Sequence, residues 1–336
     1  MADATSPVRW GILSTAKIGR EKVVPGILRS KDLQIVAVAS RDAARAAEFA
    51  AACGAARAFG SYEALLADPE VEAIYNPLPN HLHVPFTLAA ARAGKHVLCE
   101  KPIAITAAEA EALRDVPPGI HVAEAFMIRH HPQWQKAIEI VASGQIGELR
   151  AVQVAFSYFN ADPANIRNRK DIGGGGLLDI GCYALMSGRL LFGADPMRAT
   201  AIIERSAAFG TDTLSSGLFD FGAGRHLGFS VSTQLVPFQR VQALGTKGRI
   251  EIEIPFNPPP DAATRIFVDD GTRLGGRNAR EIAFPPVDQY QLQAEAFGRT
   301  VRGLAPVVGG IEDAILNMRA LDALARAGDS GRWEVV

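Results

Sequence analysis

Residues 97–102 read Val-Leu-Cys-Glu-Lys-Pro, an apolar run that stops at a charged pair and a proline. A short apolar run bounded by such a stop signal is typical of a buried strand. In an open α/β sheet, the loops beyond the carboxyl ends of the strands form the ligand crevice. A lysine at such an end faces cofactor and substrate, so Lys101 is the first catalytic candidate, with Glu100 beside it as a cofactor contact.

Strand-like and helix-like segments alternate around this stretch, which predicts an α/β fold with a doubly wound parallel Rossmann sheet. We expect strands at 8–13, 33–39, 73–76 and 121–126, and helices at 42–52, 84–93 and 107–114. The dinucleotide-binding domain is therefore expected to span residues 1–124, and the second domain residues 125–336.

The turn after the first strand has the context of a dinucleotide fingerprint, in which backbone N–H groups at a helix N-terminus hold the pyrophosphate. Gly11 stands at the first glycine position and Ala16 at the third, but Leu13 replaces the second glycine. The alternative is that Gly11 and Gly19 only separate a strand from a helix. The candidate cofactor contacts here are Gly11, Leu13, Ser14, Thr15, Ala16, Lys17 and Ile18.

The second strand ends at Ser40-Arg41, where NAD-binding proteins carry an acidic residue for the ribose 2′-hydroxyl. A hydroxyl and a guanidinium suit a 2′-phosphate instead, with Arg45 one helical turn further on. These residues favour NADP over NAD as the cofactor. Two alternatives stay open: Asp42 can turn toward the ribose, and Arg41 can be a solvated surface charge.

The third strand leads into a stiff polar turn at residues 76–83. Pro79, Asn80 and His83 lie where they can contact ribose or nicotinamide. The alternative is helix capping by Asn80 with exposed histidines.

From Leu149 onward, consecutive strand-like runs and hairpin turns replace the alternation. They predict an α+β domain with a large, mostly antiparallel sheet, one face of which packs on the core. Residues 288–304 and 311–327 are expected to form closing helices near the first domain.

Within this half, four glycines at 173–176 precede a predicted helix that carries Asp179 and Tyr183. Glycines remove side chains where backbone approaches a ligand, and residues four apart share one helix face. Both residues are therefore catalytic and substrate-binding candidates. The alternative is a packing role for Tyr183 and a helix-dipole role for Asp179.

The chain resembles the glucose-fructose oxidoreductase / inositol dehydrogenase / rhizopine catabolism family of oxidoreductases. The resemblance rests on residues 11–16, the Asn80–His83 turn, Glu100-Lys101-Pro102 and residues 173–183. It is closest to the NADP-using branch with glucose-fructose oxidoreductase, D-xylose dehydrogenases and dimeric dihydrodiol dehydrogenases. The resemblance implies a homodimer through the open sheet face, and it places Arg129 near the substrate.

Hydride removal from a sugar carbon requires a base for the attached hydroxyl. We assign this role to Tyr183, with Lys101 favouring phenolate and Asp179 holding the lysine or contacting the substrate. Phe159, Asn160 and Arg167 supply further groups for a sugar, although polar loop residues are usually only solvated.

The preferred substrate is a cyclic aldose of the D-xylose or D-glucose type, oxidised at C1 to the lactone. The alternatives are an aldose–aldose or aldose–ketose oxidoreductase with tightly bound NADP(H), a dihydrodiol or deoxyosone reductase, and a non-catalytic NADPH-binding regulator.

Composition limits the remaining classes. A formal net charge of −1 argues against a nucleic-acid partner. The three cysteines are too scattered for a disulfide framework, and no ligand cluster supports a metal site. Residues 1–7 lack a leader pattern, and no apolar run of about eighteen residues indicates a membrane span. These features predict a cytoplasmic protein.

Overall fold

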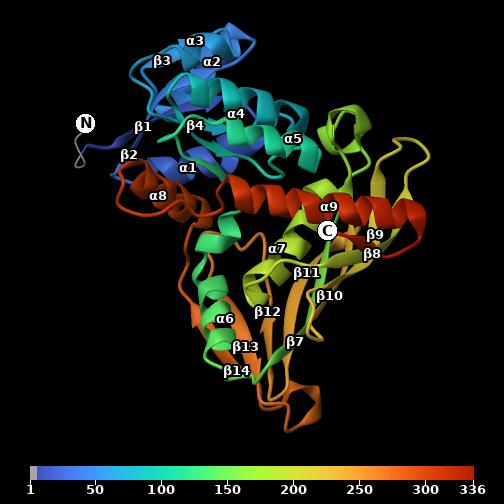
Figure 1. Ribbon diagram of the computed structural model, residues 1–336. Helices are drawn as coiled ribbons and strands as arrows, with labels where there is room; N and C mark the ends of the chain where they lie inside the picture. The colour runs from blue at the N-terminus through green and yellow to red at the C-terminus, as the bar shows by residue number, and fades with distance from the viewer. Residues whose placement is uncertain (1–5) are drawn as a thin grey trace. The chain divides into compact units, whose positions relative to one another are not determined.

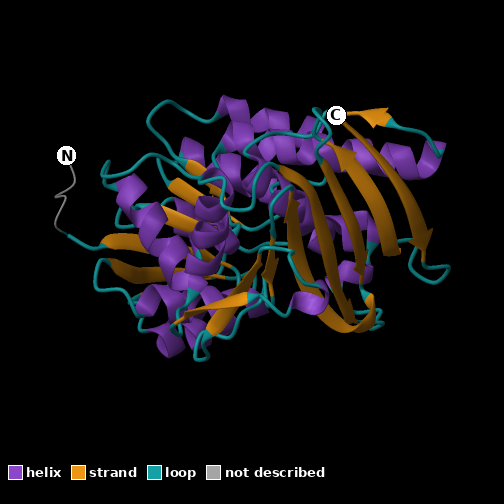
Figure 2. Ribbon diagram, turned by 90° about the horizontal axis from the view of Figure 1, so that it is seen from below, coloured by secondary structure: helices purple, strands orange, loops and turns teal. Residues whose placement is uncertain are grey.

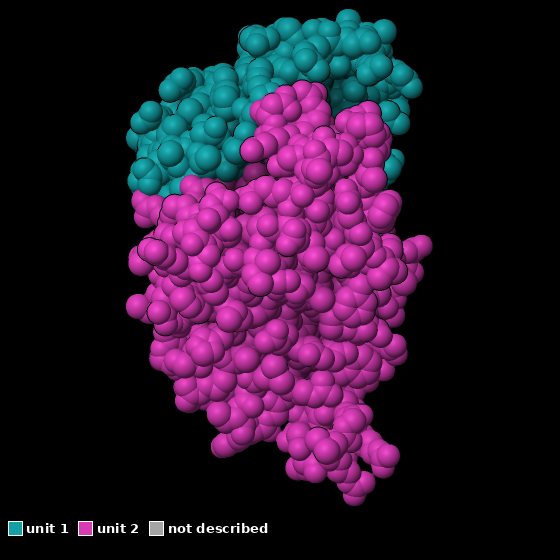
Figure 3. Space-filling model, turned by 90° about the vertical axis from the view of Figure 1, so that its right-hand side faces the viewer, with its two compact units in different colours: residues 1–130, 288–315 teal, residues 131–287, 316–336 magenta. Residues whose placement is uncertain are grey.

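The computed structural model describes residues 6–336, so residues 1–5 of the segment searched for a leader lie outside it. The chain forms two compact units, coloured separately in Figure 3. Unit 1 holds the residues up to His130 together with Asp288–Ile315, and unit 2 holds His131–Val287 and Leu316–Val336. The predicted domain boundary between residues 124 and 125 stays a prediction. Unit 1 also contains a later part of the chain, Asp288–Ile315.

Unit 1 is built on a six-stranded sheet with the order β3-β2-β1-β4-β5-β6, and every neighbouring pair is parallel (Figure 1). The strand order reverses between β1 and β4, where a doubly wound sheet binds its ligand at the carboxyl ends. The predicted Rossmann sheet is confirmed. Its strands are β1 Val8–Leu13, β2 Leu33–Ala39, β3 Arg57–Phe59, β4 Ala73–Asn76, β5 His96–Cys99 and β6 Val122–Glu124.

Helices and helical turns connect these strands: η1 Gly19–Val23, α1 Val24–Leu28, α2 Ala43–Cys53, α3 Tyr62–Leu66, η2 Asn80–Leu82, α4 His83–Arg92, α5 Ala107–Glu111, η3 Ala112–Asp115 and η4 Met127–His130. Helix α8, Gln289–Val301, returns from the far end of the sequence to join unit 1. Phe297 of α8 packs on Trp10 of β1 in the core, with 5.7 Å between ring centroids. The sheet core is therefore completed by a helix that is distant in sequence.

Unit 2 contains a nine-stranded sheet with the order β14-β13-β12-β11-β7-β10-β9-β8-β15. Its pairs are antiparallel except β10 with β7, which are parallel. The predicted large, mostly antiparallel sheet is confirmed. Its strands are β7 Leu149–Phe159, β8 Arg198–Arg205, β9 Asp212–Asp220, β10 His226–Ser232, β11 Gln234–Gly245, β12 Arg249–Ile252, β13 Thr264–Asp269, β14 Arg280–Phe284 and β15 Glu334–Val335.

One face of this sheet is buried and the other is open. Along β7, Val152, Val154 and Phe156 are buried, whereas the intervening residues are exposed or half-buried. Alternate residues of a strand point to opposite faces, so this pattern marks a single covered face. Figure 2 shows helices on one side of the strands. The helical segments of unit 2 are α6 Pro132–Ala142, η5 Ile166–Asn168, η6 Lys170–Ile172, η7 Leu177–Gly181, α7 Cys182–Phe192, η8 Leu274–Gly276 and most of α9 Ile311–Ser330.

Among residues 6–336, none of the helices has the length and apolar character needed to cross a bilayer.

Candidate active site

The turn after β1 is held in an unusual backbone conformation. Leu13 ends the strand with its side chain fully buried, and Ser14 follows with φ +84°, a region that favours glycine. Such a conformation costs roughly 1–3 kcal/mol in a non-glycine residue and is often found at ligand sites. The Ser14 amide donates to Ala39 O (2.8 Å), and its Oγ accepts from the Ala16 amide (3.3 Å). The backbone conformation that favours glycine is therefore adopted by Ser14, and not by Leu13, which stands at the position of the second glycine.

Gly11 is enclosed by core side chains. It lies inside β1, and a Cβ there would come within 2.9–3.0 Å of Leu65, Val71 and Ile74 side-chain atoms. Its lack of a side chain is required by core packing against neighbouring elements of unit 1. Its contact with the cofactor stays a prediction.

The end of β2 arranges its polar groups around a helix start. The Asp42 carboxylate is the N-cap of α2 and accepts from the Ala44 (3.0 Å) and Arg45 (3.2 Å) amides. Ser40 Oγ accepts from the Asp42 amide, and the Arg41 side chain hydrogen-bonds the Tyr62 hydroxyl. Asp42 is thus engaged with its own helix, through these amides and through Arg45 Nε at 3.5 Å, and its role toward the ribose stays a prediction.

His83 is enclosed in unit 1 and does not present its ring to a ligand. It is 1 % exposed, and its Nδ1 and Nε2 lie 2.7 Å from Pro102 O and 2.6 Å from Leu78 O. Burial lowers the pKa of His83 to about 4, and the two carbonyl contacts act in the opposite direction. The expected cofactor contact is corrected: the ring joins the turn after β4 to the Lys101–Pro102 segment. Pro79 and Asn80 lie in the same turn, and both are half-buried.

Lys101 follows β5 between two anchored neighbours. Glu100 Oε1 accepts from the buried Tyr75 hydroxyl (2.7 Å), and the Glu100 amide donates to Asn76 O (3.0 Å). On the other side, the Lys101–Pro102 peptide is cis, and Pro102 O is held by His83. The backbone that carries the lysine is therefore fixed on both sides.

Arg129 lies in η4 of unit 1, where its guanidinium forms an ion pair with Asp313. The side chain is 12 % exposed. This contact gives Arg129 a partner within its own unit, and its role toward substrate stays a prediction.

In unit 2, the glycines before η7 make room for the chain itself. A Cβ at Gly175 would lie 2.1 Å from Asp212 Oδ1, and one at Gly174 would lie 2.6 Å from Arg167 O. Asp212 Oδ2 accepts from the Leu177 amide at 2.6 Å, so a half-buried carboxylate caps the start of the helical segment. The sequence predicts that these glycines admit a ligand, whereas Asp212 and loop carbonyls lie where side chains at Gly174 and Gly175 would be.

Asp179 and Tyr183 lie four residues apart, in η7 and the first turn of α7. Asp179 Oδ2 accepts from the Tyr158 hydroxyl (2.6 Å) and from Arg167 Nε (2.8 Å). Tyr183 is 5 % exposed and packs on Phe156 and Phe256, with ring centroids 5.9 Å and 5.4 Å away. The structure therefore brings Arg167 and Asp179 together within unit 2.

Phe159 and Asn160 are placed differently from the expectation. Tyr158 points to the helix-covered face, so the next residue, Phe159, projects toward the open face, and it is 67 % exposed. Asn160 Oδ1 accepts from the Asp162 amide and from Asn168 Nδ2, which closes its own loop. Neither side chain belongs to the hydrogen-bonded cluster of Tyr158, Arg167 and Asp179.

Asp212 escaped the sequence-based assignment of roles, whereas Tyr158 counts there among the polar and aromatic groups suited to a sugar. The face of the strand on which Tyr158 lies follows from counting alternate residues from the apolar Phe156. Asp212 gave no signal, because its partner Leu177 is 35 residues earlier in the chain. In the described residues, no group of three or more potential ligands forms a metal site.

The fold and the comparisons that follow define an NAD(P)-binding oxidoreductase with a Rossmann unit and a second unit built on a large, mostly antiparallel sheet. A family model for the oxidoreductase family with an NAD-binding Rossmann fold matches residues 8–116, and a model for its C-terminal domain matches residues 134–251. The chain belongs to this Gfo/Idh/MocA family, as the sequence motifs predicted.

Individual relatives extend over nearly the whole chain. An uncharacterized oxidoreductase of Rhizobium meliloti is 45 % identical, covering 98 % of this chain and 99 % of its own. A D-xylose 1-dehydrogenase (NADP⁺) of Haloferax volcanii is 40 % identical, covering 96 % and 98 %. The crystal structure of a 3-ketoreductase from Actinomadura kijaniata with NADP and TDP-benzene has a TM-score of 0.89 at 28 % identity, covering 96 % and 98 %.

Proposed function

We propose that the protein oxidises a cyclic aldose of the D-xylose or D-glucose type at C1 to the lactone, with NADP⁺ as hydride acceptor. The observation that carries the proposal is that a buried phenol, Tyr183, lies four residues after a carboxylate, Asp179, that Tyr158 and Arg167 hold in place. A general base beside groups that bind sugar hydroxyls meets the demand of alcohol oxidation. The similarity to an NADP⁺-dependent D-xylose 1-dehydrogenase supports the substrate class.

The preference for NADP over NAD is part of the proposal. A carboxylate that binds the ribose 2′-hydroxyl is the usual requirement for NAD. Here Asp42 is occupied as a helix cap, while Ser40, Arg41 and Arg45 supply a hydroxyl and two cations. Guanidinium groups form the charge-assisted hydrogen bonds that a 2′-phosphate accepts. In the turn after β1, the positive φ of Ser14 and the start of η1 without a side-chain cap fit the pyrophosphate.

The chain's own residues have the following proposed roles. Tyr183 takes the proton of the C1 hydroxyl as the C1 hydride leaves, and it returns a proton in the reducing direction. Lys101 lowers the cost of phenolate by its positive charge. Asp179 holds the lysine or a sugar hydroxyl, and Arg167 lies beside it as a further substrate contact. Bound NADP⁺ supplies the hydride acceptor.

The absorbance spectrum of the purified protein tests the proposal. We expect continuous growth of the reduced-nicotinamide band when D-xylose or D-glucose is added with excess NADP⁺. A band of one equivalent per subunit without added cofactor would instead indicate tightly bound NADP(H) and transfer between two sugars. Absence of any change with aldoses would contradict the aldose assignment and favour a dihydrodiol or keto-sugar substrate, or a non-catalytic NADPH-binding regulator.

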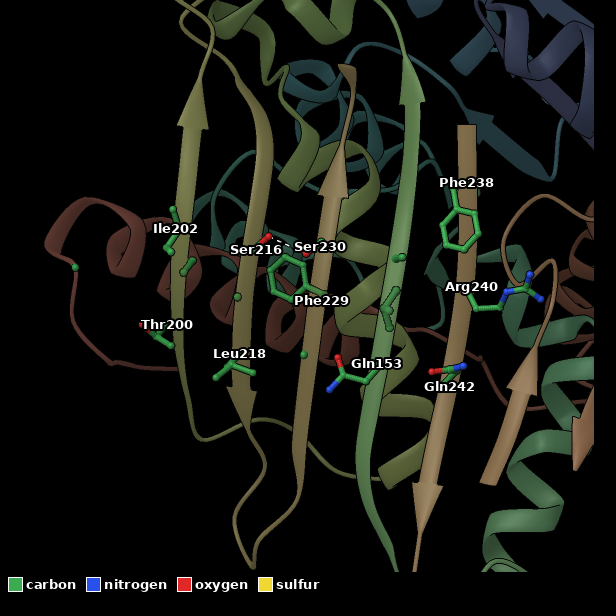
Figure 4. A pocket seen from close by; sticks show the side chains of 16 residues that line it. Gln153, Thr200, Ile202, Ser216, Leu218, Phe229, Ser230, Phe238, Arg240 and Gln242 are labelled. Atoms are coloured by element: carbon green, nitrogen blue, oxygen red, sulfur yellow. Dashed lines mark hydrogen bonds between the residues drawn. The ribbon is translucent and has the colours of Figure 1, made fainter. Parts of the chain in front are cut away.

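We further propose that the open face of the larger sheet joins two copies of the chain. Thr200 and Ile202 of β8 and Ser216 and Leu218 of β9 form an uncharged field toward the β8 side of this face, with Ile202 73 % exposed (Figure 4). Arg240 at its side lies 3.1 Å from Glu251, which offsets its charge. A face without net charge can meet its own copy without repulsion, as a twofold interface requires. Ile202→Arg is expected to convert a dimer into a monomer, measured by sedimentation equilibrium.

The proposed location is the cytoplasm. The three cysteines are all buried and free, as expected in a reducing compartment. Detection of the native protein in a cell fractionation experiment would test this.

A further inference from the structure

Tyr158 lies next to the proposed catalytic pair but outside the groups assigned to it so far. It is the penultimate residue of β7, and its hydroxyl donates to Asp179 Oδ2 at 2.6 Å. We propose that Tyr158 is a positioning residue that fixes the carboxylate of Asp179 for catalysis. This inference rests on the proposed function, because it gives Tyr158 a task only if Asp179 acts on lysine or substrate.

The spacing of strand and helix residues supports this assignment. Phe156 and Tyr158 are two residues apart on β7, which corresponds to about 6.7 Å along a strand. Asp179 and Tyr183 are four residues apart along the helical segments, which corresponds to about 6 Å. The two pairs therefore match in length: Phe156 packs on Tyr183, and Tyr158 bonds Asp179. One strand supports both proposed catalytic side chains.

Tyr158 and Arg167 donate to the same oxygen of Asp179. The Tyr158 hydroxyl and Arg167 Nε converge on Oδ2, at 2.6 and 2.8 Å. Two donors from different directions fix the rotation of the carboxyl group about its Cβ–Cγ bond. The direction of Oδ1 is thereby set by groups that belong to the sheet and to the loop before η7.

The protonation states of the two donors keep the arrangement constant. Burial, with the Asp179 charge second, raises the pKa of Tyr158 well above its ordinary value, so it stays a neutral donor. The Asp179 charge raises the pKa of Arg167, so it stays a cation. Tyr158 is therefore unsuited to act as a base itself, in contrast to the role proposed for Tyr183.

Tyr158→Phe removes the hydrogen bond and keeps the ring. We expect kcat for aldose oxidation to fall about tenfold, the effect of losing one hydrogen bond to a charged group, with the KM for NADP⁺ unchanged. Ser157→Ala is the matched control, because it removes the neighbouring hydroxyl, which donates to Val236 O. Its kcat is expected to stay within twofold of wild type.

A double-mutant cycle separates positioning from simple packing. If Tyr158 acts through Asp179, adding Tyr158→Phe to Asp179→Asn changes kcat less than twofold. If the effects of the two substitutions on kcat multiply, the proposal is overturned. This holds even if the same two substitutions are coupled in the free energy of unfolding, because the hydrogen bond would then stabilise the fold without affecting catalysis.

The failure of the proposed function gives a different result. Wild type without NADP⁺-dependent turnover of any aldose would remove the proposed function and the positioning role with it. An active wild type whose kcat is unchanged by Tyr158→Phe would remove the role of Tyr158 alone.

Discussion

Two helical segments, η1 in unit 1 and η7 in unit 2, begin in the same way, but different side chains accept hydrogen bonds from the backbone amides near their starts. Each is a single π-helical turn that runs directly into an α-helix. Before η1, the side chain that reaches the turn is a neutral hydroxyl, Ser14 Oγ. At η7 it is a half-buried carboxylate, Asp212. A carboxylate repels a second anion, so only the start in unit 1 suits a phosphate.

The glycines near these two segments also differ in what lies beside them. Gly11 makes room for apolar core side chains, and Gly175 makes room for a carboxylate of the chain itself. Neither glycine is therefore evidence of ligand approach, although both stand where a phosphate-binding loop would place one. What occupies the space beside a glycine decides its role.

The largest expected effect comes from Gly175→Ala. The new Cβ would meet Asp212 Oδ1 at 2.1 Å, and the residue has φ +123°. Strain and overpacking together are expected to lower the free energy of unfolding by about 3 kcal/mol or more. Chemical denaturation measures this. Gly54→Ala is the control, because Gly54 also has a positive φ (+70°) but no atom within 4 Å of the new Cβ, and about 1 kcal/mol is expected.

Gly11→Ala follows, with an expected loss of about 2 kcal/mol from overpacking against Leu65, Val71 and Ile74. The dissociation constant for NADP⁺, measured by fluorescence titration below the melting range, is expected to change less than threefold. If Gly11→Ala left the free energy of unfolding unchanged and weakened NADP⁺ binding tenfold, Gly11 would be a phosphate-binding residue. The two glycines would then differ in function.

Cofactor discrimination is expected to come from side chains at the end of β2. Arg41→Ala is expected to weaken NADP⁺ binding roughly tenfold and leave NAD⁺ binding unchanged, because a phosphate contact is lost. Asp42→Asn is the matched variant: asparagine is an equally good N-cap, so stability and the NADP⁺/NAD⁺ ratio should both stay close to wild type. A large shift toward NADP⁺ in Asp42→Asn would show that its carboxylate opposes the phosphate.

The smallest expected effect is the pH dependence of the Asp212 cap. Burial raises the pKa of Asp212 above its unfolded value of 3.8. The folded state therefore binds the proton more tightly, and this contribution to stability is present below pH 3.8 and lost as pH rises through the folded pKa. Relative to Asp212→Asn, wild type should lose about 1 kcal/mol or less between pH 4 and pH 7, measured by urea unfolding. A wild type that gains stability with pH relative to the variant would contradict this sign.

The parallel sheet of unit 1 could be predicted because its strands are short apolar runs set between helices. β1, β2 and β4 begin and end where the apolar runs do. β3 and α3 were missed, since three and five residues are too short to show a period. In unit 2, β13 and β14 were missed because charged residues interrupt their alternation.

The candidate site was predictable where its partners are neighbours in sequence. The helical spacing of Asp179 and Tyr183 follows from a local pattern. The bonds from Tyr158 and Asp212 depend on how β7 and β9 reach the helical segment, which local periodicity does not encode. His83 was misassigned for the same reason, because its carbonyl partner Pro102 lies 19 residues away.

The late arrival of α8 bears on how the protein is made. Trp10 emerges from the ribosome early, yet Phe297, its aromatic neighbour in the core, is translated almost three hundred residues later. During synthesis the nascent Rossmann sheet therefore exposes an unfilled apolar surface until α8 has been synthesised. A fragment released after residue 124 would carry that surface permanently, so chaperone dependence and aggregation are the expected fate of truncated translation products.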